Sequence, residues 1–245
     1  MTPRRSRPAA TLMPPLKVGI PLYENFDPLD VVGPFQTFSF AGMDCYLLGP
    51  SLEVMPSDEG IPLMPRATFK SCPQLDVIFV PGGSNTEIVL AKGRLGHNEL
   101  LDFLVRQAPG AKLVCSVCTG ALLLAAAGLL DGHTVTTHWA YKPVLSLFKC
   151  HVVDDYRRYV QSGNRVTGGG ISSGLDEALY IVSLLYGTQH ARRGQLMMQY
   201  HPQPIFHSGD PADTDIKDDP GMVDEIIQSF GVQQTVETVK KWIAG

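Results

Sequence analysis

The chain has 245 residues, of which 44% are hydrophobic, and its formal net charge is −4. This composition predicts a soluble globular protein with a sizeable core. It excludes the basic surface that nucleic-acid binding requires, and no apolar run approaches the ~20 residues that cross a bilayer. We therefore expect no nucleic-acid partner and no membrane partner.

Residues 1–15 are rich in arginine and proline and lack the apolar run of a secretory signal, so we expect a disordered N-terminal tail. Residues 16–200 predict one α/β domain. A proline-rich stretch, His201–Pro220, then leads to apolar residues at helical spacing over Met222–Ala244. We expect residues 201–245 to form a linker and a C-terminal helical extension that packs on the same domain or on a dimer partner.

Within residues 16–200, short apolar runs alternate with helix-patterned segments. The apolar runs predict strands at Lys17–Leu22, Tyr46–Gly49, Val77–Val80 and Lys112–Ser116. The helix-patterned segments are Val31–Phe40, Asn98–Gln107, Thr119–Leu129 and Ser173–Leu185. This alternation predicts a three-layer α/β fold, in which helices cover both faces of a mostly parallel sheet. Such folds bind ligands at the carboxyl ends of their strands.

Candidate site residues follow two of these strands. Asp30 comes shortly after the first strand, where it either caps the next helix or supplies a carboxyl group for proton transfer. After the third strand, the glycines of Pro81-Gly82-Gly83-Ser84 let backbone N–H groups approach a ligand closely. Gly82 and Gly83 therefore form either a tight turn or an anion-stabilising wall.

A cysteine follows the fourth strand, in Ser116-Val117-Cys118-Thr119-Gly120-Ala121, where that strand turns abruptly into a small-residue helix. This geometry presents a nucleophile at a helix N-terminus, where the dipole and the unpaired N–H groups should lower the pKa of a thiol. Cys118 is therefore the candidate nucleophile, with Thr119 beside it. The alternative is that Cys118 is a buried small hydrophobic residue.

The cysteine pattern argues against redox and metal chemistry. Cys115 and Cys118 have a Cys-x-x-Cys spacing, but Cys115 lies back in the strand, which argues against a redox pair. No second Cys or His pair at ligand spacing accompanies them, so we expect no metal site. The five cysteines are odd in number and scattered through apolar segments, which favours a reducing compartment. We therefore expect a cytoplasmic protein.

Two later segments carry weaker signals. The glycines of Gly168–Gly174 have a spacing reminiscent of dinucleotide loops, but no acidic residue follows at the end of a second strand. We interpret this loop as a tight turn into the next helix, near the wall of the site. His138, in Thr136-Thr137-His138-Trp139, either pairs with the cysteine or is a structural residue beside an aromatic ring, and we favour the structural role.

Four segments, taken in order, carry a resemblance to a known family. They are Pro81-Gly82-Gly83, the turn at Cys118, Ala127-Gly128-Leu129-Leu130-Asp131-Gly132 and Thr136-Thr137-His138-Trp139. Together they resemble the ThiJ/PfpI superfamily over most of Leu16–Tyr186. The resemblance implies a flavodoxin-like core of the class I glutamine amidotransferase type.

Many members of that superfamily place a histidine directly after the cysteine and a glutamate after the first strand, where this chain has Thr119 and Asp30. The missing histidine leaves a peptidase-type triad without a base. The chain is instead similar to the isocyanide (isonitrile) hydratases. The segments that carry this similarity are Leu29-Asp30 with Gly33-Pro34, Ser116 to Gly120, and Gln195-Leu196 to Tyr200 followed by Pro202, Pro204 and Phe206.

The hydratase resemblance implies hydration of an isocyanide to an N-substituted formamide, without a metal or an organic cofactor. Cys118 would add to the isocyanide carbon and form a thioimidate, with Asp30 as general acid and base. Thr119 would orient the substrate or the water, and the amides of Gly82 and Gly83 would line the anion-stabilising side. The resemblance also implies a homodimer.

Two alternatives stay open. Relatives with glyoxalase or deglycase activity imply attack of the same thiolate on an aldehyde such as methylglyoxal. A ligand-sensing or redox-sensing protein is the non-enzymatic alternative, since an exposed low-pKa cysteine oxidises readily. Only about 40 residues follow Pro204, too few for the paired DNA-binding units of the regulators that carry this core, and the chain is acidic.

Overall fold

The computed structural model describes residues 14–84, 86, 98–217, 219 and 221–244, so residues 1–13 of the predicted tail lie outside the described part of the chain. Its centre is a seven-stranded sheet of order β10-β11-β7-β6-β1-β2-β5. The strands are β1 (Lys17–Pro21), β2 (Asp44–Gly49), β5 (Ala67–Thr68), β6 (Val77–Val80), β7 (Leu113–Ser116), β10 (Tyr159–Ser162) and β11 (Arg165–Gly168). Neighbouring strands run parallel, except that β10 pairs with β11 in the antiparallel sense.

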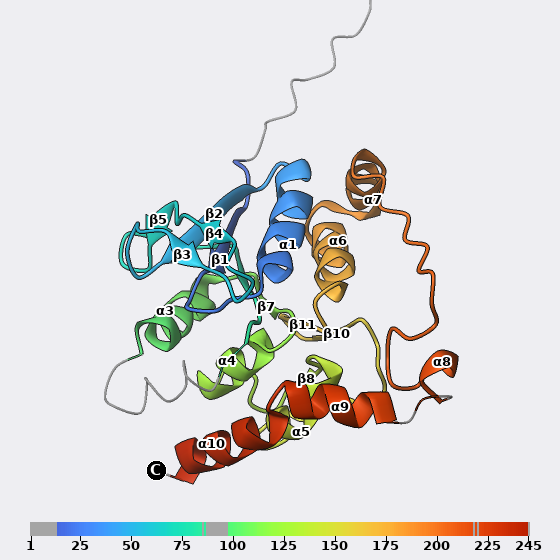
Figure 1. Cartoon of the computed structure of the whole chain (residues 1–245). Coiled ribbons are helices and arrows are strands. Elements are labelled where there is room, and N and C mark those ends of the chain that lie inside the picture. Colours follow the sequence, from blue (N-terminus) through green and yellow to red (C-terminus); the bar gives the residue numbers. More distant parts are fainter. Residues whose placement is uncertain (1–13, 85, 87–97, 218, 220, 245) are drawn as a thin grey trace, which may run out of the picture.

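Helices cover both faces of this sheet (Figure 1). On one face α1 (Pro28–Phe40) and α6 (Ser173–Tyr186) lie side by side with α7 (Thr188–Met197) next to them, and on the other lie α3 (Glu99–Gln107) and α4 (Gly120–Ala126). The predicted three-layer, flavodoxin-like architecture is therefore confirmed. Among the described residues, none of the helices has the length and apolar character that crossing a membrane requires.

Shorter elements complete the described part of the chain. Two small strand pairs are β3 (Met55–Pro56) with β4 (Pro62–Leu63), and β8 (Thr134–Val135) with β9 (His151–Val152). Further helical segments are the 3-10 turns η1 (Ala108–Gly110) and η2 (Trp139–Tyr141), then α5 (Lys142–Leu145), α8 (Thr214–Lys217), α9 (Gly221–Ser229) and α10 (Val232–Ala244).

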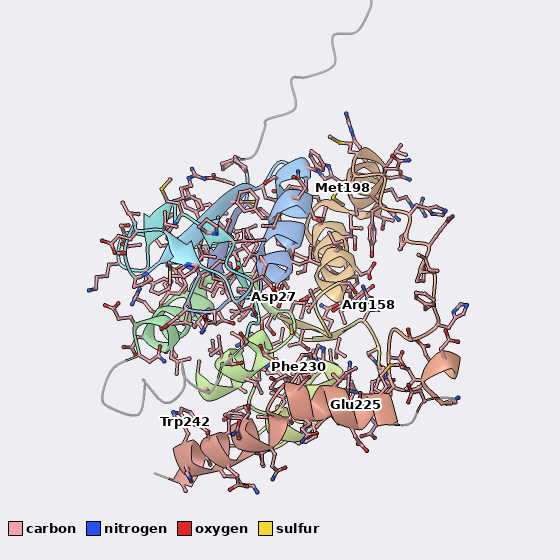
Figure 2. The ribbon with its side chains drawn as sticks, viewed as in Figure 1. Asp27, Arg158, Met198, Glu225, Phe230 and Trp242 are labelled. Atoms are coloured by element: carbon pink, nitrogen blue, oxygen red, sulfur yellow. The ribbon has the colours of Figure 1, made fainter. Side chains whose placement is uncertain are left out.

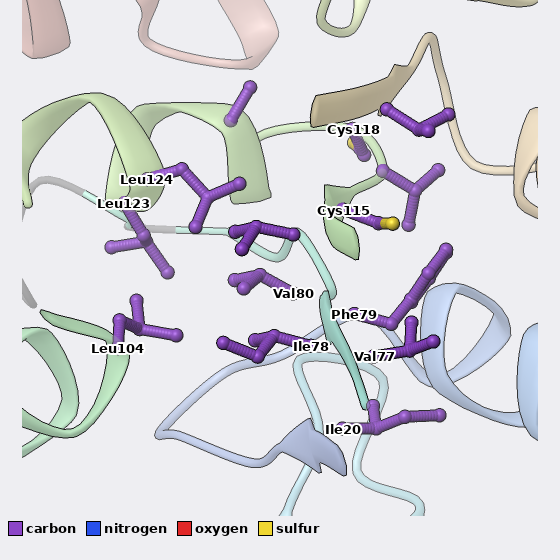
Figure 3. Packing of buried hydrophobic residues seen from close by; sticks show 14 of the residues in the cluster. Ile20, Val77, Ile78, Phe79, Val80, Leu104, Cys115, Cys118, Leu123 and Leu124 are labelled. Atoms are coloured by element: carbon purple, nitrogen blue, oxygen red, sulfur yellow. The ribbon is translucent and has the colours of Figure 1, made fainter. Parts of the chain in front are cut away.

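The central strands are buried on both faces, as their nearly continuous apolar sequences predict. The four residues of β6 are fully buried. On one side Phe79 meets Phe38 of α1 edge to face, with 5.5 Å between the ring centroids. On the other side β6 packs against Leu104, Leu123 and Leu124 (Figure 3). Burial of one such side chain contributes about 1.5–3 kcal/mol, so these contacts hold the three layers together.

The start of α1 decides the role of Asp30. Pro28 occupies the first turn, and the side chain of Asp27 accepts hydrogen bonds from the N–H groups of Leu29 and Asp30. Asp27 is therefore the helix cap, and the interpretation of Asp30 as the cap is wrong. Asp30 lies in the first turn of the helix, is fully buried, and accepts a hydrogen bond from the N–H of Gly82 in the loop after β6.

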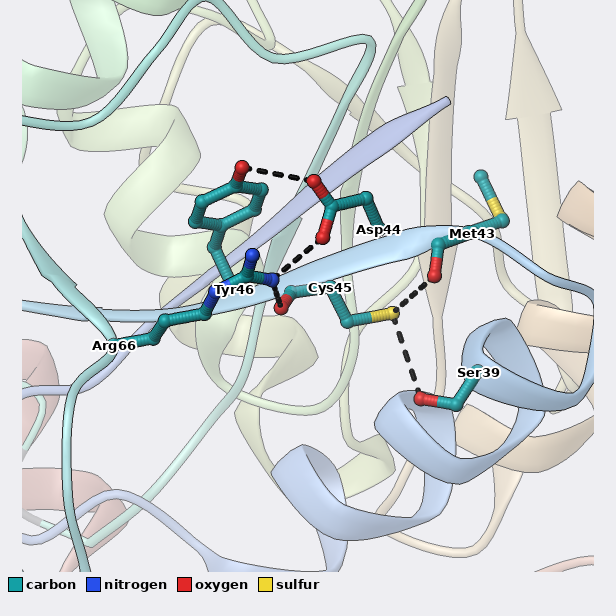
Figure 4. Close-up of polar contacts among 6 residues, drawn as sticks. All are labelled: Ser39, Met43, Asp44, Cys45, Tyr46 and Arg66. Carbon is teal, nitrogen blue, oxygen red and sulfur yellow. Dashed lines mark hydrogen bonds and ion pairs between the residues drawn. The ribbon is translucent and has the colours of Figure 1, made fainter. Parts of the chain in front are cut away.

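A polar network lies on β2, near one edge of the sheet (Figure 4). Arg66 donates to Asp44 Oδ1 at 2.5 Å and to the carbonyl oxygen of Cys45 at 2.9 Å, and its guanidinium lies 4.1 Å from the ring centroid of Tyr46. Ser39 donates to the Cys45 sulfur at 3.7 Å. Burial raises the pKa of the Cys45 thiol to about 11, so this cysteine is an unreactive structural residue.

The C-terminal helices pack against the same chain. Val239 of α10 is fully buried and Val232 nearly so, where α10 contacts α5. The ring of Trp242 lies 6.0 Å from that of Phe148, measured between centroids. Figure 1 shows α9 and α10 running past α5 at the end of the sheet where β7 leads into α4. The extension therefore lies close to the carboxyl ends of the central strands.

The core also buries a carboxyl group. Glu177 on α6 is fully buried, and neither of its carboxylate oxygens has a hydrogen-bond partner among the described residues. A β-carbon at Gly168 would lie 2.3 Å from Glu177 Oε2, so the glycine makes room for the carboxyl group. Burial, and then the charge of Asp30, raise the pKa of Glu177 well above its ordinary value. Burial therefore favours the neutral form of Glu177.

This burial predicts a pH dependence of stability. The contribution of neutral Glu177 is fully present below the ordinary pKa of a glutamate and is lost as pH rises towards the raised pKa of the folded state, by up to about 1.4 kcal/mol per pH unit. We expect Glu177→Gln to remove this loss, so that Tm falls less between pH 5 and pH 8 than in the wild type. Thermal unfolding at several pH values measures it, with the exposed Glu225→Gln as control. Parallel Tm curves for Glu177→Gln and wild type would contradict a neutral Glu177.

Candidate active site

Cys118 occupies a strained turn between β7 and α4. Its φ is +55°, in the left-handed region that costs a residue with a side chain about 1–3 kcal/mol. Two hydrogen bonds hold this conformation. The N–H of Cys118 donates to the carbonyl oxygen of Gly169 at 2.7 Å, and Thr137 Oγ1 donates to the carbonyl oxygen of Cys118 at 2.7 Å. The predicted abrupt turn is therefore present, and neighbouring segments fix it.

Two backbone segments approach each other closely at this turn. A β-carbon at Gly82 would lie 2.6 Å from the backbone nitrogen of Thr119 and 2.8 Å from the β-carbon of Cys118. A β-carbon at Gly120 would lie 2.3 Å from the carbonyl oxygen of Val80. Only glycine fits at either position, because a β-carbon would overlap backbone that cannot move aside. The loop after β6 is thus packed directly on the cysteine turn.

The carboxyl group of Asp30 lies beside the thiol of Cys118. Asp30 Oδ2 accepts a hydrogen bond from the N–H of Gly82 at 2.8 Å, while Oδ1 is buried without a full hydrogen bond among the described residues. Burial, and then the charge of Asp27, raise the pKa of Asp30 well above its ordinary value, although the Gly82 amide and the Cys118 thiol act in the opposite direction. Asp30 is therefore a carboxyl group that retains its proton unusually well.

Thr119 and the two candidate glycines form a closed set of hydrogen bonds. The hydroxyl group of Thr119 accepts from the N–H of Gly83 and donates to the Gly83 carbonyl oxygen, both at 2.9 Å. The N–H of Gly82 is already directed to Asp30. The N–H groups of Gly82 and Gly83, which were expected to face an anion, are therefore hydrogen-bonded within the protein. They orient Asp30 and Thr119, respectively.

The expectation of a lowered thiol pKa is wrong. Cys118 is only 7% exposed, and burial, followed by the charge of Asp30, raises the pKa of its thiol well above the ordinary value. The N–H groups of Thr119 and Ile171 act in the opposite direction, but they are outweighed. The dipole argument fails because α4 is short and the sulfur lies in a dry, acidic surrounding. Burial therefore favours the protonated form of both the thiol and the neighbouring carboxyl group.

A small cavity of about 90 Å³ opens over the sulfur, and we call it the thiol cavity. Its lining residues follow β1, β6, β7, β8 and β11 or lie between β3 and β4, and one comes from the C-terminal extension: Asp27, Asp58, Gly83, Ser84, Cys118, Thr119, His138, Tyr141, Ile171 and Phe230. Asp58 Oδ2 accepts from the N–H of Ser84 at 3.1 Å, while its Oδ1 is buried without a partner among the described residues. Because carboxyl groups contribute to its lining, the cavity suits a small ligand without negative charge.

His138 lies in the wall of the thiol cavity, but no hydrogen bond joins it to Cys118. Its Nδ1 accepts from the N–H of Ala140 at 3.3 Å and so caps the turn η2. Burial lowers the pKa of His138 to about 4, which keeps the ring neutral. These contacts support the structural role over pairing with the cysteine. A second cavity of about 390 Å³ also has His138 and Ile171 in its wall.

The glycine loop Gly168–Gly174 has the predicted role of a turn beside the site. The carbonyl oxygen of Gly169 accepts from Cys118, and Ile171 lines the thiol cavity. Sequence reasoning missed Asp58, Tyr141 and Phe230, which reach the site from loops and helices with no motif of their own. Within the described residues, no group of three His, Cys, Asp or Glu side chains is arranged to hold a metal ion.

The mostly parallel α/β sandwich is a flavodoxin-like fold. At its functional site, a cysteine in a strained strand-to-helix turn lies beside an acidic residue from the first helix. Within this fold class the chain belongs to the DJ-1/PfpI family, whose sequence model matches residues 16–184.

Individual relatives agree with this placement. The chain is 42% identical over 198 residues to the isonitrile hydratase of Pseudomonas putida, covering 80% of this chain and 83% of that protein. The crystal structure of a ThiJ/PfpI family protein from Pseudomonas syringae superposes with a TM-score of 0.83 at 32% identity, covering 93% of this chain and 91% of the other. The transcriptional regulator GbdR of Pseudomonas aeruginosa is 27% identical over 73% of this chain and 48% of the regulator.

The proximity of the two groups predicts how Asp30 controls the thiol. Asp30→Asn removes an ionisable carboxyl group beside the sulfur at nearly constant volume. Because the ionised form of Asp30 raises the pKa of Cys118, that pKa should fall in the variant and the pH profile of alkylation should move to lower pH. The measurement is the rate of iodoacetamide modification of Cys118 against pH, followed by peptide mass spectrometry. The exposed Glu53→Gln is the control. An unchanged or higher midpoint in Asp30→Asn would show that the carboxyl group does not act on the thiol.

Proposed function

We propose that this protein hydrates isocyanides to N-substituted formamides without a cofactor. The observation that carries the proposal is the 42% identity with an isonitrile hydratase over 80% of the chain. The site supports it in a specific way. An isocyanide is a small neutral molecule with a soft electrophilic carbon, and the thiol cavity offers a buried sulfur beside a carboxyl group that retains its proton.

In the first step the sulfur of Cys118 adds to the terminal carbon of the isocyanide. That carbon also carries a lone pair, so it accepts a proton as the sulfur–carbon bond forms. Asp30 delivers this proton to the carbon and takes the proton that leaves the thiol. The product of the step is a thioimidate, Cys118–S–CH=N–R, and the net change is addition of S–H to one carbon atom.

In the second step a water molecule attacks the thioimidate carbon. Asp30, which the first step leaves protonated, gives its proton to the nitrogen and then, as a carboxylate, takes a proton from the attacking water. The carbon–sulfur bond of the resulting tetrahedral intermediate then breaks. The sulfur leaves as the thiol with a proton from Asp30, and the hydroxyl proton of the intermediate passes to Asp30 as the carbonyl group forms. The sum of both steps is R–NC plus water giving R–NH–CHO.

We assign the supporting roles from the hydrogen bonds of the site. The N–H groups of Thr119 and Ile171, which favour the ionised form of Cys118, stabilise charge on the sulfur as it adds and leaves. Gly82 orients Asp30, and Gly83 fixes the hydroxyl group of Thr119. Asp27 and Asp58 disfavour anionic ligands. We further propose that the enzyme acts in the cytoplasm as a homodimer on small molecules.

The proposal predicts that hydration depends on two residues. Cys118→Ala should abolish formamide production, because no sulfur can add to the carbon. Asp30→Asn should lower kcat by about 10²–10⁴-fold, the contribution of one positioned acid–base group. The measurement is loss of cyclohexyl isocyanide and appearance of its formamide by mass spectrometry.

Cys150→Ala, which changes a half-buried cysteine that does not line the thiol cavity, is the matched control and should keep full activity. Absence of turnover with a range of isocyanides would refute the proposal. Turnover of methylglyoxal in its place would favour the glyoxalase alternative, and ligand binding without turnover would favour a sensor.

A further inference from the structure

The C-terminal extension brings an aromatic ring to the mouth of the thiol cavity. Phe230 lies between α9 and α10, and Gly231, with φ of +60°, allows the chain to turn there (Figure 2). Phe230 is 43% exposed and lines the same cavity as Cys118. Phe230 is therefore a solvent-exposed part of the cavity wall, whereas Cys118, at 7% exposed, is a buried part.

Contacts with the α/β domain fix this ring. Tyr141 donates its hydroxyl hydrogen to the carbonyl oxygen of Phe230 at 3.0 Å. The Phe230 ring stacks with that of Tyr141 at 6.2 Å and meets His138 edge to face at 5.4 Å, both between centroids. Buried Val239 anchors α10 on the same side. Phe230 is thus a positioned wall residue, since its backbone and its ring are both held.

The lining of the cavity combines acidic and aromatic groups. Asp27 and Asp58 contribute carboxyl groups to the lining, whereas the contacting rings of His138, Tyr141 and Phe230 contribute an aromatic cluster. The reacting end of an isocyanide must reach Cys118, so its substituent must extend towards the entrance. There it meets an apolar ring, which favours an uncharged group and leaves little space for a large one.

We propose that Phe230 is a specificity-determining residue that restricts access to Cys118 to compact, uncharged substituents. The naming of isocyanides as the substrates rests on the proposed function, but the restriction itself concerns any electrophile that reacts with the thiol. Phe230 lies outside residues 16–184, the part of the chain that the family model matches, whereas His138 and Tyr141 lie within it. The extension therefore adds selectivity to a site that the α/β domain builds.

The first test uses thiol alkylation, which does not depend on the natural reaction. Cys118 modification by iodoacetamide and by its bulkier N-phenyl derivative is followed by peptide mass spectrometry in the full-length protein. Phe230→Ala should raise the ratio of the bulky to the compact rate by about tenfold, and Phe230→Leu should raise it by less. Phe206→Ala, at a 69% exposed ring outside the thiol cavity, is the control and should keep the wild-type ratio.

The second test compares kcat/KM for cyclohexyl and methyl isocyanide in the same variants. A higher cyclohexyl preference in Phe230→Ala supports the proposal, with circular dichroism confirming the fold. If Phe230→Ala fails to fold, Phe230→Leu gives the answer. Ratios within about twofold of wild type in folded Phe230 variants would overturn the proposal, even if hydration occurs. Altered alkylation ratios without hydration of any isocyanide would support the role of Phe230 in restricting access to Cys118 and would refute the proposed reaction.

Discussion

The contact between two backbone segments is the constraint on which the site depends. Gly82 and Gly120 bring the loop after β6 onto the turn at Cys118 so closely that neither position has room for a β-carbon. This contact places the Gly82 amide on Asp30 and the Thr119 hydroxyl group on Gly83. The parallel order of β1, β6 and β7 places all three loops at one edge of the sheet. The relative position of Cys118 and Asp30 thus follows from main-chain packing.

Burial gives this pair its chemistry. Cys118 and Asp30 are both removed from water, and burial raises the pKa of each. The charges that act on the two groups are acidic, so both pKa shifts favour the protonated forms. The proposed reaction adds a sulfur and a proton to one carbon atom, and a protonated carboxyl group beside the thiol can supply that proton.

Features that depend on local sequence patterns could be predicted from the sequence. The strand Val77–Val80 has its predicted ends, and Asp30 and Cys118, which follow β1 and β7, lie side by side as expected for neighbouring parallel strands. Features that depend on contacts between segments far apart in the chain could not be predicted in this way. The antiparallel β10–β11 pair has weak alternation, and the thiol pKa depends on neighbours that only the folded chain supplies. Phe230 reaches the site through the docking of α10, which helical spacing alone does not specify.

The central claim is that the Cys118 sulfur bonds to the isocyanide carbon during turnover. Rapid acid quench of wild-type protein mixed with an isocyanide, followed by peptide mass spectrometry, tests this bond directly. The account predicts a transient adduct on Cys118 that adds the whole mass of the substrate, and formamide that forms as the adduct decays. Formamide production by Cys118→Ala at the wild-type rate, or turnover with no adduct on any time scale faster than kcat, would contradict it.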